Sequence, residues 1–300
     1  MADRGIDVVR AHLAKLPPSG SLTIAERRAQ YERAEKVFPT PPEVKVERVS
    51  APTAPAEWLR PPGAVPGRVV LYLHGGGYVI GSPRSHRHLA AAIAIASAAS
   101  ALLLEYRLAP EHPYPAAVDD ATAAYRWLLD GGIAPEHVVI AGDSAGGGLT
   151  VATLLALRDA KLPLPAGSVC ISPWVDLTCS GESYRTRADV DPIVERASVA
   201  EMAKAYLGST PARSPLASPL FADLRGLPPL LIHVGDAEVL LDDAVQLAER
   251  AKAAGVETTL EVRERMIHVW HWFLPMLDEA QSAVEAIGRF ARERASQSAR

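Results

Sequence analysis

The amino-acid sequence predicts an α/β fold with a mainly parallel central sheet flanked by helices. Six short apolar runs lie between residues 69 and 268, and segments with helical periodicity fill most of the gaps between them. These runs are apolar on both faces, which is typical of strands covered by helices on both sides of a sheet. The 300 residues, 48% of them hydrophobic, are enough for one large core.

The first 68 residues have a different pattern. Residues 1 to about 38 predict one or two amphipathic helices, interrupted at Pro17–Gly20. A proline-rich connector follows over 39–42. Residues Val44–Val49 then alternate between apolar and polar for most of their length, as in an edge strand.

From residue 69 onward, strand-like and helical segments alternate. The expected strands and the turns that end them span 69–77, 101–110, 138–148, 168–174, 230–236 and 258–268. The expected helices span 85–100, 116–129, 149–160, 240–254 and 278–294.

One long segment, residues 176 to about 221, interrupts this alternation and contains no strand-like run. About 45 residues between two strands is too long for an ordinary loop, so we expect a functional insertion such as a lid. A disordered spacer is the alternative. The apolar side chains of Val194, Met202 and Tyr206 favour one or two short packed helices instead.

Charge and composition exclude several classes of function. The net charge is −4, without a long basic run, so no nucleic-acid partner is expected. The longest low-charge stretch, 89–104, is shorter than the roughly 20 residues that cross a bilayer, so no membrane insertion is expected. The N-terminus lacks the apolar run of a secretory signal, which predicts a soluble, cytoplasmic protein. Cys170 and Cys179 are too few for a disulfide framework.

The segment Gly142–Gly146 matches the pattern G-x-S-x-G between a buried strand and a helix. The turn from strand to helix is too sharp for side chains two positions either side of Ser144, hence the glycines. Such a turn exposes the serine oxygen as a nucleophile, next to free N–H groups at the helix N-terminus. A tight turn with an idle serine is the alternative. A phosphate-binding loop is excluded because no Lys-Ser/Thr pair follows the glycines.

A second glycine-rich turn, His74–Gly77, ends an earlier predicted strand. Glycines let backbone N–H groups approach a substrate closely. In a hydrolase, the N–H groups of Gly76 and Gly77 would complete an oxyanion hole with that of Ala145. The alternative is a flexible turn, and His74 itself is expected to be structural.

Three motifs in this order resemble one known family. HGGG at 74–77, YRLAPEHPYPAA at 106–117 and GDSAGG at 142–147 are similar to the hormone-sensitive-lipase-like carboxylesterases, bacterial family IV of the α/β-hydrolases. The similarity extends from about residue 40 to about residue 290. It implies an α/β-hydrolase core with a helical cap and no cofactor. It also implies hydrolysis of carboxylic esters by a Ser-His-Asp/Glu triad, and it suggests a homodimer.

The base of such a triad follows the last strand. Only His268 and His271 lie after residue 233, and His268 ends the last strand-like run, where the family has its catalytic histidine. We therefore expect His268 to be the base and His271 to be a packed or surface residue. A metal site at these two histidines is not expected, because no further ligands are suitably spaced. Because the base must be neutral, activity should fall below about pH 6.

The acid of the triad has two candidates after the strand at 230–236. The family usually shows Asp-Pro-Leu here, and Glu238-Val239-Leu240 occupies that position, so Glu238 is the first candidate. Asp236 is the second, although it would also suit the N-cap of the helix that follows. Asp242 and Asp243 lie farther into that helix and are poor candidates.

These features divide the chain into an N-terminal part of the cap (1–45), a first part of the core (46–175), a cap insertion (176–222) and a second part of the core (223–300). The expected reaction is hydrolysis of short- to medium-chain acyl esters, with small-molecule esters as the only partners besides a second copy of the chain. The alternatives are an amidase or peptidase with the same triad, or a non-catalytic receptor for a small ligand on the same fold.

Overall fold

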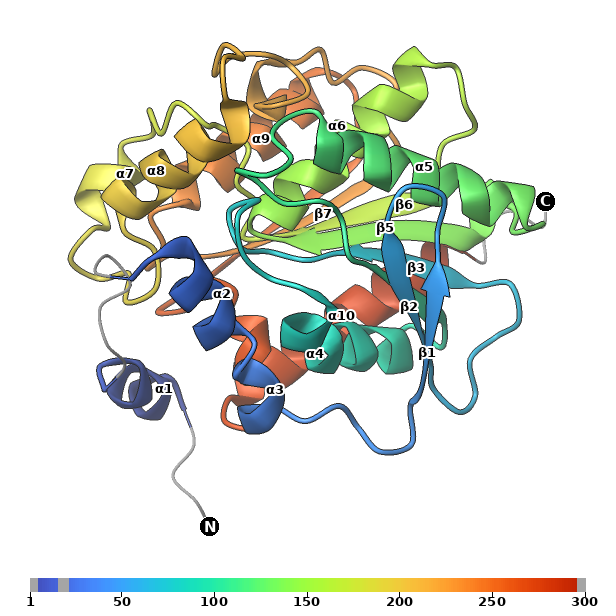
Figure 1. Ribbon diagram of the computed structural model, residues 1–300, viewed down its shortest axis with the longest axis horizontal. Coiled ribbons are helices and arrows are strands. Elements are labelled where there is room, and N and C mark those ends of the chain that lie inside the picture. The colour runs from blue at the N-terminus through green and yellow to red at the C-terminus, as the bar shows by residue number, and fades with distance from the viewer. Residues whose placement is uncertain (1–4, 16–21, 296–300) are drawn as a thin grey trace.

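An eight-stranded sheet crosses the molecule in the computed structural model, which describes residues 5–15 and 22–295 (Figure 1). The strand order is β1-β2-β4-β3-β5-β6-β7-β8. Strand β2 pairs antiparallel with both of its neighbours, and all pairs from β4 to β8 are parallel. This confirms the predicted α/β fold. The strands are β1 Lys45–Ser50, β2 Pro55–Arg60, β3 Val69–Leu73, β4 Ser100–Leu104, β5 Val138–Asp143, β6 Gly167–Ile171, β7 Leu230–Gly235 and β8 Thr258–Arg263.

The helices agree with the expected periodicity except at their ends. Helix α6 begins at Ala145, directly after the predicted nucleophile, and α4 ends at Ala96, before the chain turns into β4. The predicted break at Pro17–Gly20 lies outside the described residues. The α-helices are α1 Ile6–Leu13, α2 Ile24–Tyr31, α3 Ala34–Val37, α4 Pro83–Ala96, α5 Ala116–Asp130, α6 Ala145–Asp159, α7 Ser183–Thr186, α8 Arg196–Leu207, α9 Leu241–Ala253 and α10 Asp278–Arg294.

Helices cover both faces of the sheet. Alternate residues of β3 separate into two clusters: Leu71 and Leu73 pack with α5, α6 and α9, while Val70 and Tyr72 pack with α4 and α10. This alternation follows from the two-residue period of a strand. It explains why the central strands are apolar throughout, and it produces the three layers seen in Figure 1.

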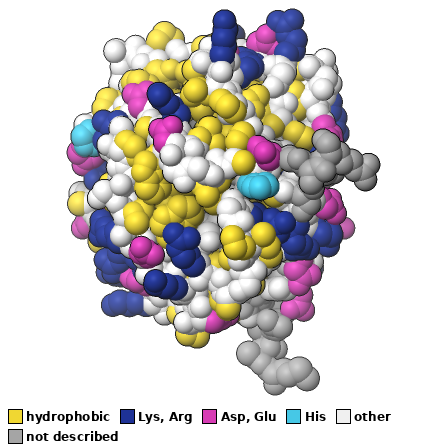
Figure 2. All heavy atoms as spheres, turned by 90° about the vertical axis from the view of Figure 1, so that its right-hand side faces the viewer, with side chains coloured by type: hydrophobic (Ala, Val, Ile, Leu, Met, Phe, Trp, Pro, Cys, Tyr) yellow, Lys and Arg dark blue, Asp and Glu magenta, His cyan; other side chains and the backbone are white. Residues whose placement is uncertain are grey.

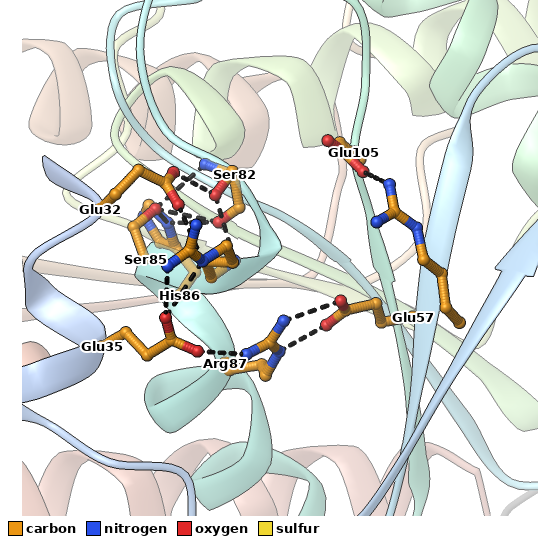
Figure 3. A network of polar contacts seen from close by, with 10 residues as sticks. Glu32, Glu35, Glu57, Ser82, Ser85, His86, Arg87 and Glu105 are labelled. Atoms are coloured by element: carbon orange, nitrogen blue, oxygen red, sulfur yellow. Dashed lines mark hydrogen bonds and ion pairs between the residues drawn. The ribbon is translucent and has the colours of Figure 1, made fainter. Parts of the chain in front are cut away.

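Strand β2 is not predicted by the sequence pattern. It begins with Pro55, and its interior contains Glu57, an acidic residue that is rare in a buried strand. Glu57 is only 7% exposed, and Arg87 of α4 forms two hydrogen bonds with its carboxylate, of 2.6 and 2.8 Å (Figure 3). The ion pair compensates the buried charge, and this compensation is invisible in the local sequence.

The segment 176–222 contains α7, α8 and a short 3-10 helix at Pro219–Phe221, and no strand. Two hydrogen bonds join it to the N-terminal segment: Arg10 donates to the carbonyl of Val190 at 2.9 Å, and Arg27 donates to the carboxylate of Glu201 at 3.0 Å. Figure 1 shows α7 and α8 near α1 and α2, beyond one end of the sheet. Two segments that are far apart in the sequence are therefore neighbours in space.

The surface is mixed in character. On the side of the molecule where β1 and β2 lie in Figure 1, hydrophobic side chains are interspersed with Lys, Arg, Asp and Glu (Figure 2). Within residues 5–15 and 22–295, no helix has both the length and the apolar character that a membrane crossing requires.

Helices α4 and α10 approach each other closely at Gly288, which gives a stability prediction. In an open helix position, replacing glycine by alanine stabilises a protein by about 1 kcal/mol. At Gly288 a Cβ atom would overlap the backbone of Ala96, and overpacking costs about 1–3 kcal/mol. We therefore expect Gly288→Ala to lower the melting temperature by several degrees in a calorimetric scan. The control is Arg289→Ala on the exposed side of the same helix, and an unchanged or higher melting temperature of Gly288→Ala would contradict this packing.

Candidate active site

Ser144 forms the turn between β5 and α6. Its backbone has φ 55° and ψ −122°, a conformation that costs energy for a residue with a side chain. Three hydrogen bonds hold this conformation. The N–H of Ser144 donates to the carbonyl of Ile171 at 2.8 Å, and its carbonyl accepts the N–H groups of Trp174 at 2.9 Å and Gly148 at 3.1 Å. The backbone is fixed on both sides, and the half-exposed side chain is left free to react.

The glycines of the G-x-S-x-G pattern are required by close backbone contacts. A Cβ on Gly142 would overlap the carbonyl of Gly146, and a Cβ on Gly146 would overlap the carbonyl of Leu73 at the end of β3. The turn therefore packs directly against the neighbouring strand. The spacing seen in the sequence reflects a lack of room on both sides of Ser144.

The loop after β3 holds the predicted oxyanion donors. Gly76 and Gly77 have φ of 116° and 61°, which glycine adopts readily. Among the described residues, the N–H groups of Gly76, Gly77 and Ala145 have no hydrogen-bond partner. Ala145 is the first residue of α6, where a helix leaves its N–H groups unpaired. Three free donors of this kind suit a developing negative charge.

His268 and Glu238 form a buried hydrogen-bonded pair. The Nδ1 atom of His268 lies 2.9 Å from Oε2 of Glu238, and these residues are 6% and 0% exposed. The other carboxylate oxygen, Oε1, accepts the N–H of Gly235 at 2.5 Å. Glu238 follows β7 and His268 follows β8, so the ends of two adjacent parallel strands bring them together.

Ser172, which the sequence analysis did not single out, connects Glu238 to Val269, the residue after His268. Its hydroxyl donates to Oε1 of Glu238 at 2.8 Å and accepts the N–H of Val269 at 3.1 Å. The sequence analysis also did not single out Asp191, which lies in the insertion. Its carboxylate accepts the N–H of Val239, the residue after Glu238, at 2.9 Å. Both contacts join residues that are far apart in the sequence, so no local motif predicts them.

The surroundings shift the pKa of both members of the pair. Burial raises the pKa of Glu238, and the hydrogen bonds from His268 and Gly235 oppose that change only in part. Burial by itself would lower the pKa of His268. The hydrogen bond and the charge of Glu238 outweigh burial and raise the pKa of His268 above 6.5. The site therefore stabilises the charged imidazolium, as a general base requires when it accepts a proton.

The other acidic candidates have different partners. Asp236 accepts the N–H of Arg265 at 2.6 Å, and α9 begins only at Leu241, so the expectation that Asp236 caps this helix is wrong. The chain makes an additional turn between β7 and α9, and Glu238 lies in that turn. Asp242 accepts the N–H of Ser183 at 2.9 Å, and Asp243 accepts those of Val175 and Asp176.

Ser144, Glu238 and His268 all follow the ends of parallel strands, on β5, β7 and β8. The negative charge of Asp143, the residue before Ser144, helps to raise the pKa of His268. In the part of the chain that the structure describes, no hydrogen bond joins Ser144 to His268. Such contacts are often long before a substrate binds.

The remaining histidines nearby serve the packing. Nδ1 of His74 lies 2.8 Å from the carbonyl of Gly75, and the ring stacks on Tyr106, as expected for a structural residue. His271 is fully buried, with Nε2 3.1 Å from Nδ1 of His233. Within the described ranges, no group of three or more His, Cys, Asp or Glu side chains could hold a metal ion.

Comparisons with known proteins show which family this chain resembles. The α/β-hydrolase fold family matches residues 70–272. An acetyl-hydrolase of Streptomyces hygroscopicus is 49% identical over 269 residues, which are 90% of this chain and 90% of that protein. An esterase of Acinetobacter venetianus is 33% identical over 257 residues, which are 85% of this chain and 84% of that protein.

Solved structures are similar over nearly the whole chain. An esterase from the bacterial hormone-sensitive lipase family is 49% identical with a TM-score of 0.93, over 97% of this chain and 98% of that chain. The structure of EstE5 soaked with p-nitrophenyl butyrate is 50% identical, with the same TM-score and coverage.

Buried histidines near the site give a prediction about stability in acid. Burial lowers the pKa of His88 and of His233 to about 4, lowers that of His74 to about 3, and lowers that of His271. These groups bind protons near pH 6.5 when the chain is unfolded but stay neutral in the fold. Their contribution to stability is therefore present above pH 6.5 and is lost as the pH falls toward 4.

We expect the melting temperature to decrease from pH 6.5 to pH 5, because these four histidines outnumber Asp243, Glu238 and His268, whose raised pKa values act in the opposite direction. In His88→Gln the decrease should be shallower, because one group fewer takes up a proton on unfolding in this pH range. The measurement is a series of thermal melts at constant ionic strength. A decrease in His88→Gln as steep as that of the parent would show that His88 is not held neutral.

Proposed function

The chain belongs to the hormone-sensitive-lipase-like carboxylesterases of the α/β-hydrolase fold and hydrolyses carboxylic esters, and we propose that it does so through an acyl-enzyme on Ser144. His268 is the general base and Glu238 is the acid that orients it. The observation that carries this proposal is the 2.9 Å hydrogen bond between His268 and Glu238, near the strand end that precedes Ser144.

The reaction has two steps. His268 accepts the proton of Ser144 as the serine oxygen attacks the ester carbonyl, and it then donates this proton to the departing alcohol. Water attacks the acyl-enzyme by the same route and releases the acid. Glu238 holds the Nδ1–H tautomer of His268 and stabilises the imidazolium that forms in each step.

The oxyanion of each tetrahedral intermediate is bound by the N–H groups of Gly76, Gly77 and Ala145. Their lack of partners among the described residues supports this assignment. Fixed donors of this kind act mainly on the transition state, and removing one typically costs about 2.7–4 kcal/mol of barrier.

The substrates we propose are small esters with short- to medium-chain acyl groups. The names of two similar proteins support short acyl groups, one being an acetyl-hydrolase and the other EstE5, whose crystal was soaked with p-nitrophenyl butyrate. The side chain of Met202, on α8, lies against Gly77, so the insertion covers the predicted oxyanion loop and limits the space beside it.

We further propose that segments 1–45 and 176–222 together form the cap over this site. The hydrogen bonds from Arg10 to Val190 and from Arg27 to Glu201 support this arrangement. The homodimer and the cytoplasmic location expected from the sequence stay predictions, which size-exclusion chromatography with light scattering and cell fractionation would test.

The nucleophile is tested by Ser144→Ala. We expect its hydrolysis of p-nitrophenyl acetate and butyrate to fall by roughly 10³-fold or more, because no other group can form the acyl-enzyme. Ser282→Ala, at an exposed position of α10, should keep the activity of the parent. The parent should cleave the butyrate faster than the hexadecanoate and leave the matching anilide intact. Full activity of Ser144→Ala would overturn the mechanism, and rapid anilide cleavage would indicate an amidase.

The acid is tested by Glu238→Gln and Asp236→Asn, with pH profiles of kcat/KM. Because Glu238 raises the pKa of His268, and the base must be neutral, activity of the parent should decline on the acid side at a pH above 6.5 rather than near 6. Glu238→Gln should lose about 10²- to 10⁴-fold in kcat and shift this decline to lower pH. Asp236→Asn should change neither. A large loss in Asp236→Asn alone would move the role of the acid to Asp236.

A further inference from the structure

A second buried carboxylate and histidine lie close together next to the proposed nucleophile. Asp143 directly precedes Ser144, and its Oδ2 is 3.4 Å from Nε2 of His86 on α4. The two side chains are 1% and 0% exposed, so neither reaches solvent. The reaction proposed above uses neither group. Because Nε2 of His86 accepts a backbone N–H, the hydrogen bonds that compensate the buried carboxylate of Asp143 come from other groups, among them the hydroxyl of Tyr72 at 2.8 Å.

Asp143 and His86 both accept a hydrogen bond from the same backbone N–H. Gly75 donates to Oδ1 of Asp143 at 3.1 Å and to Nε2 of His86 at 3.2 Å. The carboxylate lies so close that a Cβ on Gly75 would overlap it. Gly75 is the residue before Gly76 and Gly77, so this shared contact holds the base of the loop that carries two of the oxyanion donors.

The imidazole of His86 is itself held in place. Its Nδ1 lies 2.8 Å from the hydroxyl of Ser85, and this hydroxyl also donates to the carbonyl of Ser82 at 2.9 Å. The hydroxyl of Ser82 in turn contacts the carboxylate of Glu32, the residue directly after α2 (Figure 3). The ring packs edge-on against Trp272, with 4.9 Å between ring centroids. A side chain restrained on all sides can fix its partner within a few tenths of an ångström.

We propose that His86 and Asp143 are positioning residues that set the oxyanion loop, an inference that rests on the function proposed above. Glycines at positive φ leave the loop free to adopt several conformations. The contact at Gly75 selects one of them. Because Asp143 is also joined through the chain to Ser144 and Ala145, it aligns the donors of the loop with the donor of the helix.

This role predicts a particular kinetic signature. Oxyanion donors act on the transition state and hardly at all on the bound ester, so misplacing them lowers kcat while KM changes little. Loss of packing alone would reduce the amount of folded enzyme or its melting temperature, without weakening the binding of an oxyanion.

Two amide substitutions at position 86 separate these effects. In His86→Asn the shorter amide reaches the position of Nδ1 and keeps the contact with Ser85, but it falls short of Gly75 and Asp143. In His86→Gln the longer amide reaches the position of Nε2 and can accept the N–H of Gly75. His88→Asn is the matched control. His88 is buried on the same helix, and its Nε2 lies 3.2 Å from the carbonyl of Trp272, away from the loop.

The first measurement is kcat and KM for p-nitrophenyl acetate. The rates are expressed per folded enzyme, and circular dichroism and thermal melts give the folded fraction. The second measurement is inhibition by a trifluoromethyl ketone, which forms an oxyanion adduct with the serine. We expect His86→Asn to lose about 10- to 100-fold in kcat and a similar factor in inhibitor affinity, with KM unchanged. His86→Gln should recover most of the loss, and His88→Asn should match the parent in kcat.

Equal kcat in His86→Asn and the parent would overturn the inference, as would a loss confined to KM or equal losses in the Asn and Gln variants. If His86→Asn does not fold, His86→Gln provides the test. A kcat and an inhibitor affinity like those of the parent support the role of His86. A loss in His86→Gln as large as that expected for His86→Asn overturns it. Ser144→Ala separates the two proposals. If that variant stays active, the proposed function fails, whereas an inactive Ser144→Ala with a fully active His86→Asn rejects only the role of His86.

Discussion

The close approach of three backbones at the turn after β5 is the constraint on which the site depends. Gly142, Gly146 and the end of β3 at Leu73 meet without room for a side chain. That contact forces Ser144 into an unusual backbone conformation, which hydrogen bonds to the neighbouring strand and loop then hold. The same contact brings the free N–H at the start of α6 close to the loop after β3. One steric requirement thus positions both the nucleophile and the groups around it.

The buried charges near this turn follow a common arrangement. Glu238 accepts a backbone N–H from Gly235 and contacts His268, and Asp143 accepts a backbone N–H from Gly75 and contacts His86. Each carboxylate therefore fixes a stretch of main chain as well as an imidazole. Hydrogen bonds compensate the desolvation of each carboxylate, including one from the hydroxyl of Tyr72 to Asp143, and each carboxylate also restrains the atoms around it.

The sequence predicts the parts of this site that depend on local geometry. The turn at Ser144 needs glycines at fixed spacing, and His268 ends an apolar run, so both stand out along the chain. Glu238 was ranked ahead of Asp236 only by the family resemblance, because both residues follow β7 and the sequence does not show which of the two carboxylates faces His268. Ser172 and His86 were missed altogether, since their partners lie far along the chain and serine and histidine occur in many other settings. Strand β2 was missed for the same reason, its buried glutamate being compensated by a residue from α4.

The insertion contacts the turn that holds Glu238. Asp191 accepts the N–H groups of Ile193 and Val194 with one oxygen and that of Val239 with the other. Val239 follows Glu238 directly, so a carboxylate from the insertion restrains the turn that holds the proposed acid. The charge of Asp191 also helps to raise the pKa of His268. A lid that moved freely would break this contact at every opening and loosen the acid with it. The contact therefore favours an insertion whose base, around Asp191, stays docked on the core, with any movement confined to parts farther from the turn at Glu238.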